Sequence, residues 1–192
     1  MPFDTRRTPA QQFSKNLTHI RFIHLIANDL DAIETRRKEN KKSYLFQSYI
    51  INLVALWQTF LEDLAKESFE KMIVVEPNAS FHEVLQRNFK QLLKRFNTPK
   101  TQNIDELIEG ATGIKNISNN WHWDGMSNEN AKQLLDEILS IRHEIAHKGY
   151  SKKSLSVKGN YEYMKFLLEL ADILNAVVDN YTSAELKKRG LE

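Results

Sequence analysis

Apolar residues recur at intervals of three and four along most of the chain, which is the spacing of one face of an α-helix. The pattern is clearest from about residue 42 to 73. The apolar positions of one face in this segment are Ile50, Val54, Trp57, Leu61 and Leu64. Similar patterns run from about residue 8 to 37 and from about 80 to 96. We therefore predict three helices in the first half of the chain.

Two further helical patterns occupy the second half. One begins near Ser127 or Asn128, either of which can cap a helix, and continues toward Gly149, a residue type that favours helix ends. Its expected inward positions are Ala131, Leu134, Leu135, Ile138, Ile141 and Ile145. A basic loop over about 150–160 follows, and a strongly apolar last helix is expected from about 161 to 181.

The segment from about residue 97 to 128 has the weakest periodicity, and it is expected to be irregular. It holds Pro99, three glycines and several asparagines, so that at most one short helix is predicted, near 104–109. Trp121 and Trp123 also lie here. Two tryptophans can offer a surface for stacking bases, but such side chains more often fix a loop on the core, and we favour that interpretation.

The fold class follows from what the pattern lacks. No segment requires a strand, and 6 glycines with 4 prolines are few for a sheet with tight turns. The prediction is therefore all-α: a bundle of long antiparallel helices without a sheet. A length of 192 residues fits a single domain, 1–192, with a core large enough to need no cross-links.

Composition excludes several classes of protein. The chain has no cysteine, which rules out a disulfide framework, a thiolate metal site and a cysteine nucleophile. No apolar run approaches the ~20 residues that a membrane helix needs. Residues 1–7 are not followed by the apolar run of a leader peptide. We therefore expect a cytoplasmic protein with no membrane partner.

The segment RHEIAH at residues 142–147, near the end of the helix that leads to Gly149, satisfies two patterns with different chemistry. His143, Glu144 and His147 match H-E-x-x-H, in which two histidines bind zinc and the glutamate activates a water. Arg142 and His147 match R-x4-H instead. The two patterns imply a zinc hydrolase and a metal-independent enzyme respectively.

A catalytic zinc site needs a third protein ligand. The extended signature H-E-x-x-H-x-x-G-x-x-H is not met, because Gly149 comes one position too early and no histidine follows His147. On an ideal helix with Ile138 at the centre of the apolar stripe, His143 points about 140° away and His147 about 180° away. Both would face away from the core of their own domain. The zinc hydrolase therefore remains only as an alternative.

Arg142 lies about 40° from the centre of the stripe, at the edge of the inward face. An unpaired charge is costly there, and a guanidinium held in this position is a candidate phosphate clamp because its planar fork matches phosphate oxygens. His147 points about 140° away from Arg142, so one regular helix cannot aim both at the same atom. Either the helix frays near Gly149, or a second copy of the chain completes the site.

The segment 142–147 resembles the R-x4-6-H motif of the HEPN superfamily, with His143 in the polar position after the arginine. The segment 53–62 of the early long helix resembles the stand-alone bacterial RiboL-PSP-like branch, in which a glutamate often occupies the position of Gln58. The resemblance covers about residues 10–182. It implies a homodimeric, metal-independent endoribonuclease of the toxin or phage-defence type that needs no cofactor.

The resemblance also implies a role for each residue of the motif. His147 would be the general acid or base that helps the RNA 2′-hydroxyl attack the adjacent phosphate, leaving a cyclic phosphate end. Arg142 would stabilise the charge that develops on the phosphoryl oxygens. His143 would orient either partner or share in proton transfer, and Glu144 would support them.

Three lysines just after the motif, Lys148, Lys152 and Lys153, would hold the RNA backbone without reading its sequence. The net charge of +2 does not by itself point to nucleic acid, but residues 142–158 carry five positive side chains against one negative. Such lysines can equally be ordinary solvated loop residues. An antitoxin or regulatory protein would be a further partner. The alternative within the superfamily is a HEPN module that binds RNA or nucleotides without cutting.

Overall fold

The structure is a computed structural model that describes residues 7–74 and 78–191. Those residues form α-helices and short 3-10 turns without a strand, so the all-α prediction is confirmed. The elements are α1 (Pro9–Asp29), η1 (Leu30–Ala32), α2 (Lys38–Ile73), α3 (Ala79–Arg95), α4 (Thr101–Thr112), η2 (Ile117–Asn120), α5 (Asn128–Lys148) and α6 (Val157–Lys188). Residues 1–6, on which the expectation of no leader peptide partly rests, lie outside the described part.

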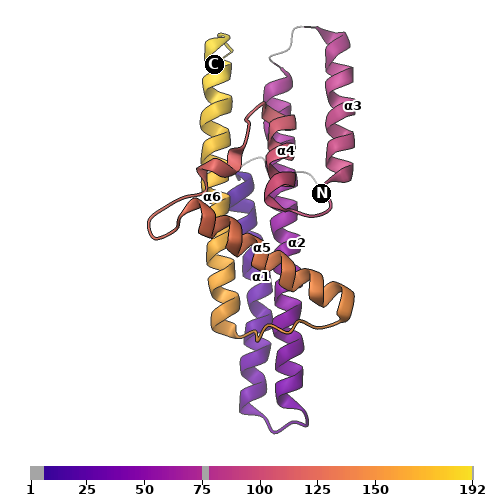
Figure 1. Cartoon of the computed structure of the whole chain (residues 1–192), viewed down its shortest axis with the longest axis vertical. Helices are drawn as coiled ribbons and strands as arrows, with labels where there is room; N and C mark the ends of the chain where they lie inside the picture. Colours follow the sequence, from indigo (N-terminus) through magenta and orange to yellow (C-terminus); the bar gives the residue numbers. More distant parts are fainter. Residues whose placement is uncertain (1–6, 75–77, 192) are drawn as a thin grey trace.

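Three long helices form the body of the bundle. Figure 1 shows α1 and α2 as an antiparallel hairpin with α6 alongside, and each of these three helices contacts the other two. The shorter α3 and α4 lie beside the C-terminal part of α2, and α5 crosses the bundle obliquely and packs on α2. None of the described helices combines the length and the apolar character of a membrane span.

The core lies where the inner faces of these helices meet. Every position of the apolar stripe predicted on the second helix is buried. Among the fully buried apolar side chains are Leu53, Trp57 and Leu61 of α2, Ile104, Leu107 and Ile108 of α4, Leu135 and Ile138 of α5, and Leu167, Leu170 and Leu174 of α6. Burying one such side chain contributes roughly 1.5–3 kcal/mol. This shared core holds α5, and with it the segment 142–147, against α2.

Local sequence signals set several helix ends. Thr8 and Gln11 form a capping box at the start of α1, where each side chain bonds the backbone of the other residue. The Ser127 side chain accepts a hydrogen bond from the backbone N–H of Asn130 and so begins α5, as predicted. Gly149 ends that helix with a φ of 78°, a conformation that glycine adopts without strain.

Three predicted helix boundaries were wrong. The first helix ends at Asp29 rather than near residue 37, and the chain turns back through η1 before α2 begins at Lys38. An ion pair of 2.9 Å between Lys42 and Asp31 closes this turn, and it cannot be seen in a hydrophobic pattern. The last helix begins at Val157, capped by Ser156, and continues beyond residue 181 to Lys188. The basic loop is therefore shorter than predicted.

The segment 97–128 is more regular than predicted. Twelve of its residues form α4, whose inward side chains Ile104, Leu107 and Ile108 are fully buried. A glycine inside the pattern, Gly110, weakened the prediction of a helix. In the structure this glycine lets α3 approach closely, because a Cβ at this position would lie 2.3 Å from the side chain of Leu92.

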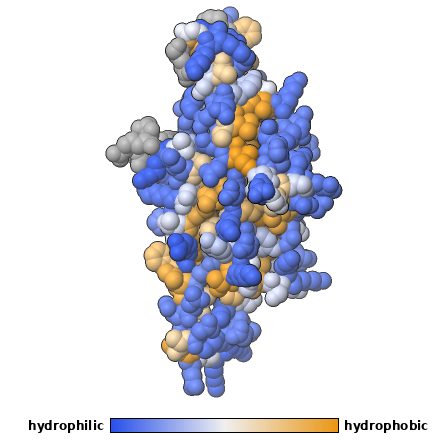
Figure 2. Space-filling model, turned by 90° about the vertical axis from the view of Figure 1, so that its left-hand side faces the viewer, coloured by the Kyte–Doolittle hydropathy of each residue, from blue (hydrophilic) through white to orange (hydrophobic). Residues whose placement is uncertain are grey.

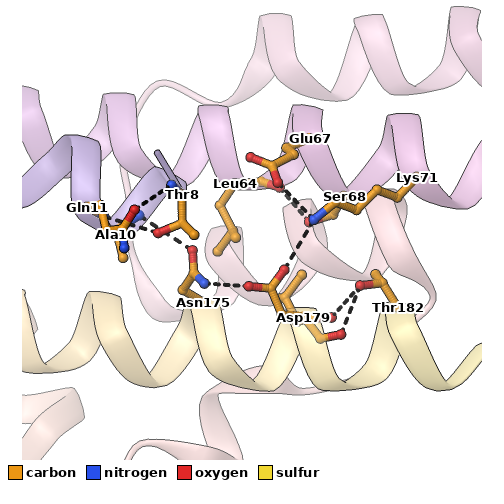
Figure 3. A network of polar contacts seen from close by, with 11 residues as sticks. Thr8, Ala10, Gln11, Leu64, Glu67, Ser68, Lys71, Asn175, Asp179 and Thr182 are labelled. Atoms are coloured by element: carbon orange, nitrogen blue, oxygen red, sulfur yellow. Dashed lines mark hydrogen bonds and ion pairs between the residues drawn. The ribbon is translucent and has the colours of Figure 1, made fainter. Parts of the chain in front are cut away.

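A polar network joins the start of α1 to α2 and α6 (Figure 3). The backbone N–H of Ala10 donates to Asn175 Oδ1 over 3.4 Å, and Asn175 Nδ2 donates to Asp179 Oδ2 over 2.6 Å. Lys71 of α2 then pairs with Asp179 at 3.3 Å and with Glu67 at 2.8 Å. These bonds fix how the three long helices stand against one another.

Candidate active site

The motif segment 142–147 lies on the last two turns of α5, a regular helix that continues through Lys148. The Gly149 N–H closes the helix by donating to the Ile145 carbonyl over 2.9 Å. The helix therefore does not fray within the motif, and this removes one of the two ways in which Arg142 and His147 could meet. Figure 1 shows the C-terminal end of α5 extending past α2 at the side of the bundle.

Arg142 is half-buried, next to the buried Ile141, as expected for the edge of the inward face. Its guanidinium makes no hydrogen bond or ion pair with any other described residue. A guanidinium carries five N–H donors in a fixed fork, so these donors are available to a ligand. A charge held at the edge of the core without a protein partner is the arrangement that an anion-binding residue requires.

His143 and His147 are both exposed on the outer side of α5. Their ring centroids are 4.2 Å apart, with an angle of 49° between the planes. Residues four apart lie one above the other on a helix, which explains this contact. His143 therefore contacts His147 directly and can restrict how that ring turns.

Glu144 has a structural task in this chain. Its carboxylate accepts hydrogen bonds from the Ser151 hydroxyl at 2.9 Å, from the Lys152 backbone N–H at 3.2 Å and from Lys148 Nζ at 3.4 Å. These bonds, the one from Ser151 foremost, lower the pKa of the Glu144 carboxyl. A carboxylate occupied in this way is a poor general base, which is the role that H-E-x-x-H would give it.

The zinc alternative also needs a third ligand. Among residues 7–74 and 78–191, no three His, Cys, Asp or Glu side chains lie close enough together to hold a metal ion. One chain therefore does not supply the three-ligand set of a catalytic zinc site in its described part.

A model of the RiboL-PSP-HEPN family matches residues 12–180. The chain belongs to this family. The match includes both the segment 53–62 and the motif at 142–147, so the superfamily and the branch expected from those two segments are confirmed. No curated protein and no solved structure matches the chain.

Gln58 stands in this HEPN chain where relatives of the branch were expected to carry glutamate. Its side-chain amide donates to Glu62 Oε1 at 3.0 Å and to the Phe96 carbonyl at 3.2 Å. The second bond ties α2 to the end of α3. A glutamate could not donate either bond, so in this member the residue joins helices rather than adding a carboxylate.

The three lysines predicted to hold RNA differ in their surroundings. Lys148 pairs with Glu144 at 3.4 Å, and Lys153 pairs with Glu137 of α5 at 2.9 Å. The Lys152 backbone N–H donates a hydrogen bond to Glu144, and the Lys152 side chain pairs with no acidic residue in the described ranges. The two ion pairs are partly exposed, and such pairs contribute about 0–1 kcal/mol, so a phosphate can replace the carboxylate at little cost.

Two residues that position the loop between α5 and α6 were missed by the sequence analysis. The Gln47 side chain accepts from the Ser151 N–H at 3.2 Å, and the Asn160 side chain donates to the Phe46 carbonyl at 3.0 Å. Both side chains are buried. The signal that could have found them is an amide residue at an inward position of a helical pattern, where it needs a hydrogen-bond partner.

The tryptophans of the segment 97–128 anchor it on the core. Trp121 is fully buried, and Trp123 packs on Phe166 of α6 with ring centroids 5.9 Å apart. Asp105 of α4 accepts from the Ser118 N–H and from its hydroxyl, both at 2.8 Å, and so holds η2. The favoured interpretation of this loop is therefore confirmed for Trp121, whose ring is closed to a base.

Proposed function

We propose that the chain is a metal-independent endoribonuclease that cuts RNA by attack of a 2′-hydroxyl on the adjacent phosphate, in a site built by two copies. The observation that carries this proposal is the geometry at the end of α5. An arginine without a protein partner in the described structure and two exposed histidines lie on one regular helix, within six residues. Membership of the RiboL-PSP-HEPN family supports the same chemistry.

The directions of the two side chains support a homodimer. Arg142 lies at the inner edge of α5 and His147 on its outer side, so one copy cannot direct both at one phosphate. A twofold axis near the end of α5 would bring the Arg142 and His147 pairs of two copies into one cleft. In one copy, this helix end extends past α2 at the side of the bundle (Figure 1).

In this proposal one His147 removes the proton of the 2′-hydroxyl while the 2′-oxygen bonds to phosphorus. The bond from phosphorus to the 5′-oxygen breaks, and the partner's His147 gives that oxygen its proton. The products are a 2′,3′-cyclic phosphate and a 5′-hydroxyl. Arg142 stabilises the charge on the non-bridging oxygens, and His143 orients the ring of His147 through their contact.

The lysines of the loop would bind the RNA backbone. Lys152 is already available, whereas Lys148 and Lys153 would exchange a carboxylate for a phosphate. Contacts of this kind carry no sequence information. An unrestrained enzyme of this type would damage the RNA of its own cell. We therefore place it among toxin or phage-defence nucleases, with an antitoxin or regulatory protein as its partner.

The test is cleavage of single-stranded RNA by the purified chain in the presence of EDTA. His147→Ala should lower the rate by about 10²–10⁴-fold, the usual contribution of a general acid or base. His122→Ala is the matched control, because His122 is an exposed histidine far along the chain from the motif. End analysis should find cyclic phosphates.

Undiminished cutting by the His147→Ala protein would contradict the proposal. RNA binding without turnover by the wild-type chain would favour the alternative of a HEPN module that binds but does not cut. Cutting that stops in EDTA and returns with zinc would favour the zinc hydrolase.

A further inference from the structure

The helix α3 has few buried side chains for its length. Figure 1 shows it at the edge of the molecule, on the side away from α6 and next to α2 and α4. Of residues 81–95, only Phe89 is buried, and its ring stacks on Phe69 of α2 with centroids 4.2 Å apart. Every other α-helix of the described structure buries at least five residues. Because helices of this length depend on packing for their stability, the open surface of α3 is a candidate for binding.

The open surface of α3 carries an apolar strip. Phe81, Val84 and Leu85 are 57%, 46% and 38% exposed, and they lie within about 100° of one another on the helix. The half-buried Leu92 continues the strip along the helix axis. Exposed apolar side chains that gather on one face mark interaction surfaces. Figure 2 shows that apolar patches also lie among hydrophilic side chains on the opposite side of the molecule, so the strip alone does not identify a partner.

A pocket of about 400 Å³ opens between this strip and α4. Its lining includes Leu85, Phe89 and Leu92 of α3 and Gly110 of α4. Among the described residues that line it, only Arg95 is charged. The volume lies at the small end of the range of roughly 300–1,000 Å³ that ligand pockets occupy. The pocket is therefore a recess with an apolar wall and a cation, into which a side chain of a partner can insert.

The polar surface of α3 is strongly basic. Four positive side chains stand against one negative, and all five are exposed: Arg87, Lys90, Lys94 and Arg95 against Glu83. None of the four cations pairs with an acidic residue in the described ranges. Arg87 follows Val84 by one turn, and Arg95 points within about 20° of the direction of Val84, three turns further along. A partner with negative groups along this flank would gain charge attraction beside the apolar contact.

We propose that α3 is the docking site for an acidic amphipathic helix of a partner protein. Apolar side chains of the partner cover Phe81, Val84 and Leu85, one of them inserts into the pocket, and the acidic flank lies along Arg87 and Arg95. Helices that dock through an apolar face use residues at i, i+3, i+4 and i+7 as anchors. Docking at α3 does not depend on ribonuclease activity. Only the identification of this partner with the antitoxin or regulatory protein rests on the proposed function.

A basic amphipathic helix can also lie on an anionic membrane, but two features of the structure favour a protein helix. The pocket is a recess that an inserted side chain can fill. In addition, α4 carries the exposed carboxylates of Glu106 and Glu109 close in sequence to Gly110, on the other wall of the pocket. An evenly anionic surface would be repelled by these carboxylates, whereas a helix can turn its acidic flank toward α3 and a neutral flank toward α4.

The first experiment measures binding of a designed helical peptide to the full chain by fluorescence anisotropy. The peptide has about 18 residues, enough to cover α3, with leucines on one face, glutamates along one flank and glutamines elsewhere. It should bind about tenfold more tightly than a version with lysine in place of glutamate, and than a version whose leucines are spread around the helix. Absent binding of the glutamate peptide, or equal binding of all three peptides, would overturn the proposal.

The second experiment tests the apolar strip. Val84→Asp should weaken binding of the glutamate peptide by about tenfold or more, because it places a charge in the centre of the contact. The melting temperature should not change, since Val84 is exposed. The matched control is Leu25→Asp, which places the same charge on an exposed apolar residue of α1 and should leave the affinity unchanged. Equal affinities of the Val84→Asp and wild-type proteins would show that the peptide binds elsewhere.

The third experiment tests charge complementarity while the apolar strip stays intact. A protein with both Arg87→Glu and Arg95→Glu should reverse the preference and bind the lysine peptide about tenfold more tightly than the glutamate peptide. Arg87→Lys with Arg95→Lys is the conservative control and should keep the wild-type preference. If the reversed protein still prefers the glutamate peptide, the basic flank of α3 does not choose the partner and the proposal is wrong.

Two further measurements test the other possible occupants of this face. Binding to vesicles of phosphatidylglycerol and phosphatidylcholine that is lost in Val84→Asp, without a preference among the peptides, would identify a membrane as the occupant. Conversion of a dimer into a monomer by Val84→Asp, measured by light scattering, would identify an interface between copies of the chain. Either result would replace the partner helix, and wild-type behaviour of Val84→Asp in both measurements supports it.

The same variants keep this proposal apart from the proposed function. Val84→Asp should cut RNA at the wild-type rate, and His147→Ala should bind the glutamate peptide with wild-type affinity. A wild-type chain that binds the peptide but does not cut RNA would contradict the ribonuclease alone. Loss of peptide binding in His147→Ala would place the peptide at the motif 142–147 and overturn docking at α3.

Discussion

At the scale of single residues, the motif contains two candidates for the chemistry, Arg142 and His147, and one residue that supports the fold, Glu144. Arg142 and His147 make no hydrogen bond or ion pair with another described residue. Glu144, in the middle of the same segment, holds the following loop with two hydrogen bonds, from Ser151 and Lys152. The segment 142–147 therefore holds residues for catalysis beside a residue for structure. Substitutions of the two kinds of residue should have different effects.

Replacement of Arg142 should impair activity without loss of stability. Arg142→Ala removes a half-buried charge that makes no ion pair in the described structure, so the free energy of unfolding should change by less than about 0.5 kcal/mol or rise. RNA cleavage should fall by about 10²–10³-fold, as for the loss of a group that stabilises transition-state charge. Urea unfolding and initial cleavage rates measure the two effects. A clear loss of stability would indicate that Arg142 is a packing residue.

The hydrogen bonds between Glu144 and the loop that follows α5 should depend on pH. Its folded-state pKa lies below the ordinary value of 4.5, so its stabilising bonds are complete above that pH and are lost as pH falls through the lowered pKa. The NMR signal of the Lys152 backbone N–H, which donates to Glu144, should therefore shift with a midpoint below 4.5. In Glu144→Gln this titration should be absent, and in the control Glu162→Gln it should persist. A midpoint above 4.5 in the wild type would contradict the assignment.

At the scale of elements, the placement of the site depends on how α5 ends. The helix stays regular through Lys148 because Gly149 takes up a φ of 78°, which reverses the chain into the basic loop. Ser151 then reaches back to Glu144 and across to Gln47 of α2. The end of α5 is thus fixed on both sides, and His147 sits on its last turn.

Gly149→Ala should destabilise the protein by about 1–2 kcal/mol, because a residue with a Cβ is strained in the left-handed region. Beyond the residues next to it in the chain, nothing lies within 4 Å of the added Cβ, so backbone strain alone should act. Gly149→Asn should cost less, since asparagine tolerates this conformation better. Thermal or urea unfolding of the three proteins tests the order. Equal stability of the alanine and glycine proteins would show that the helix end is not held in this conformation.

The helices were predictable because a helix that packs on the core needs an apolar residue every three or four positions on its inward face. The sequences of α2 and α5 follow that rule almost throughout. The reversal after Asp29 was not, since polar residues of the turn, such as the ion-paired Asp31 and Lys42, leave no signal in a pattern of apolar residues. In the candidate site, the directions of Arg142 and His147 followed from the helical wheel. The buried stacking of His24 on Tyr49 was not predictable, because it depends on how two helices pack and not on one sequence stripe.

At the scale of the whole molecule, the proposed active site requires a second copy of the chain. In one copy, α5 carries Arg142 on its half-buried side and His147 on its exposed side. A twofold axis near the end of α5 would bring the two kinds of side chain together from different copies.

A site shared by two copies predicts that two inactive variants restore each other. Arg142→Ala and His147→Ala, each inactive alone, should regain cleavage when co-expressed or unfolded and refolded together, because mixed dimers unite an intact arginine with an intact histidine from the other copy. Activity should stay well below that of the wild type, since only part of the dimers are mixed and each mixed cleft lacks two groups.

The control for this experiment mixes His147→Ala with a chain that carries both substitutions, where no intact histidine exists and no activity should return. Light scattering of each variant establishes that dimers form. If the mixture of single variants stays as inactive as this control while mixed dimers are present, one arginine and one histidine from different copies do not suffice for cleavage. Either both histidines of the dimer are then needed, or Arg142 and His147 act within one copy. The second case would require the end of α5 to rearrange when RNA binds, since a regular helix directs the two side chains about 140° apart.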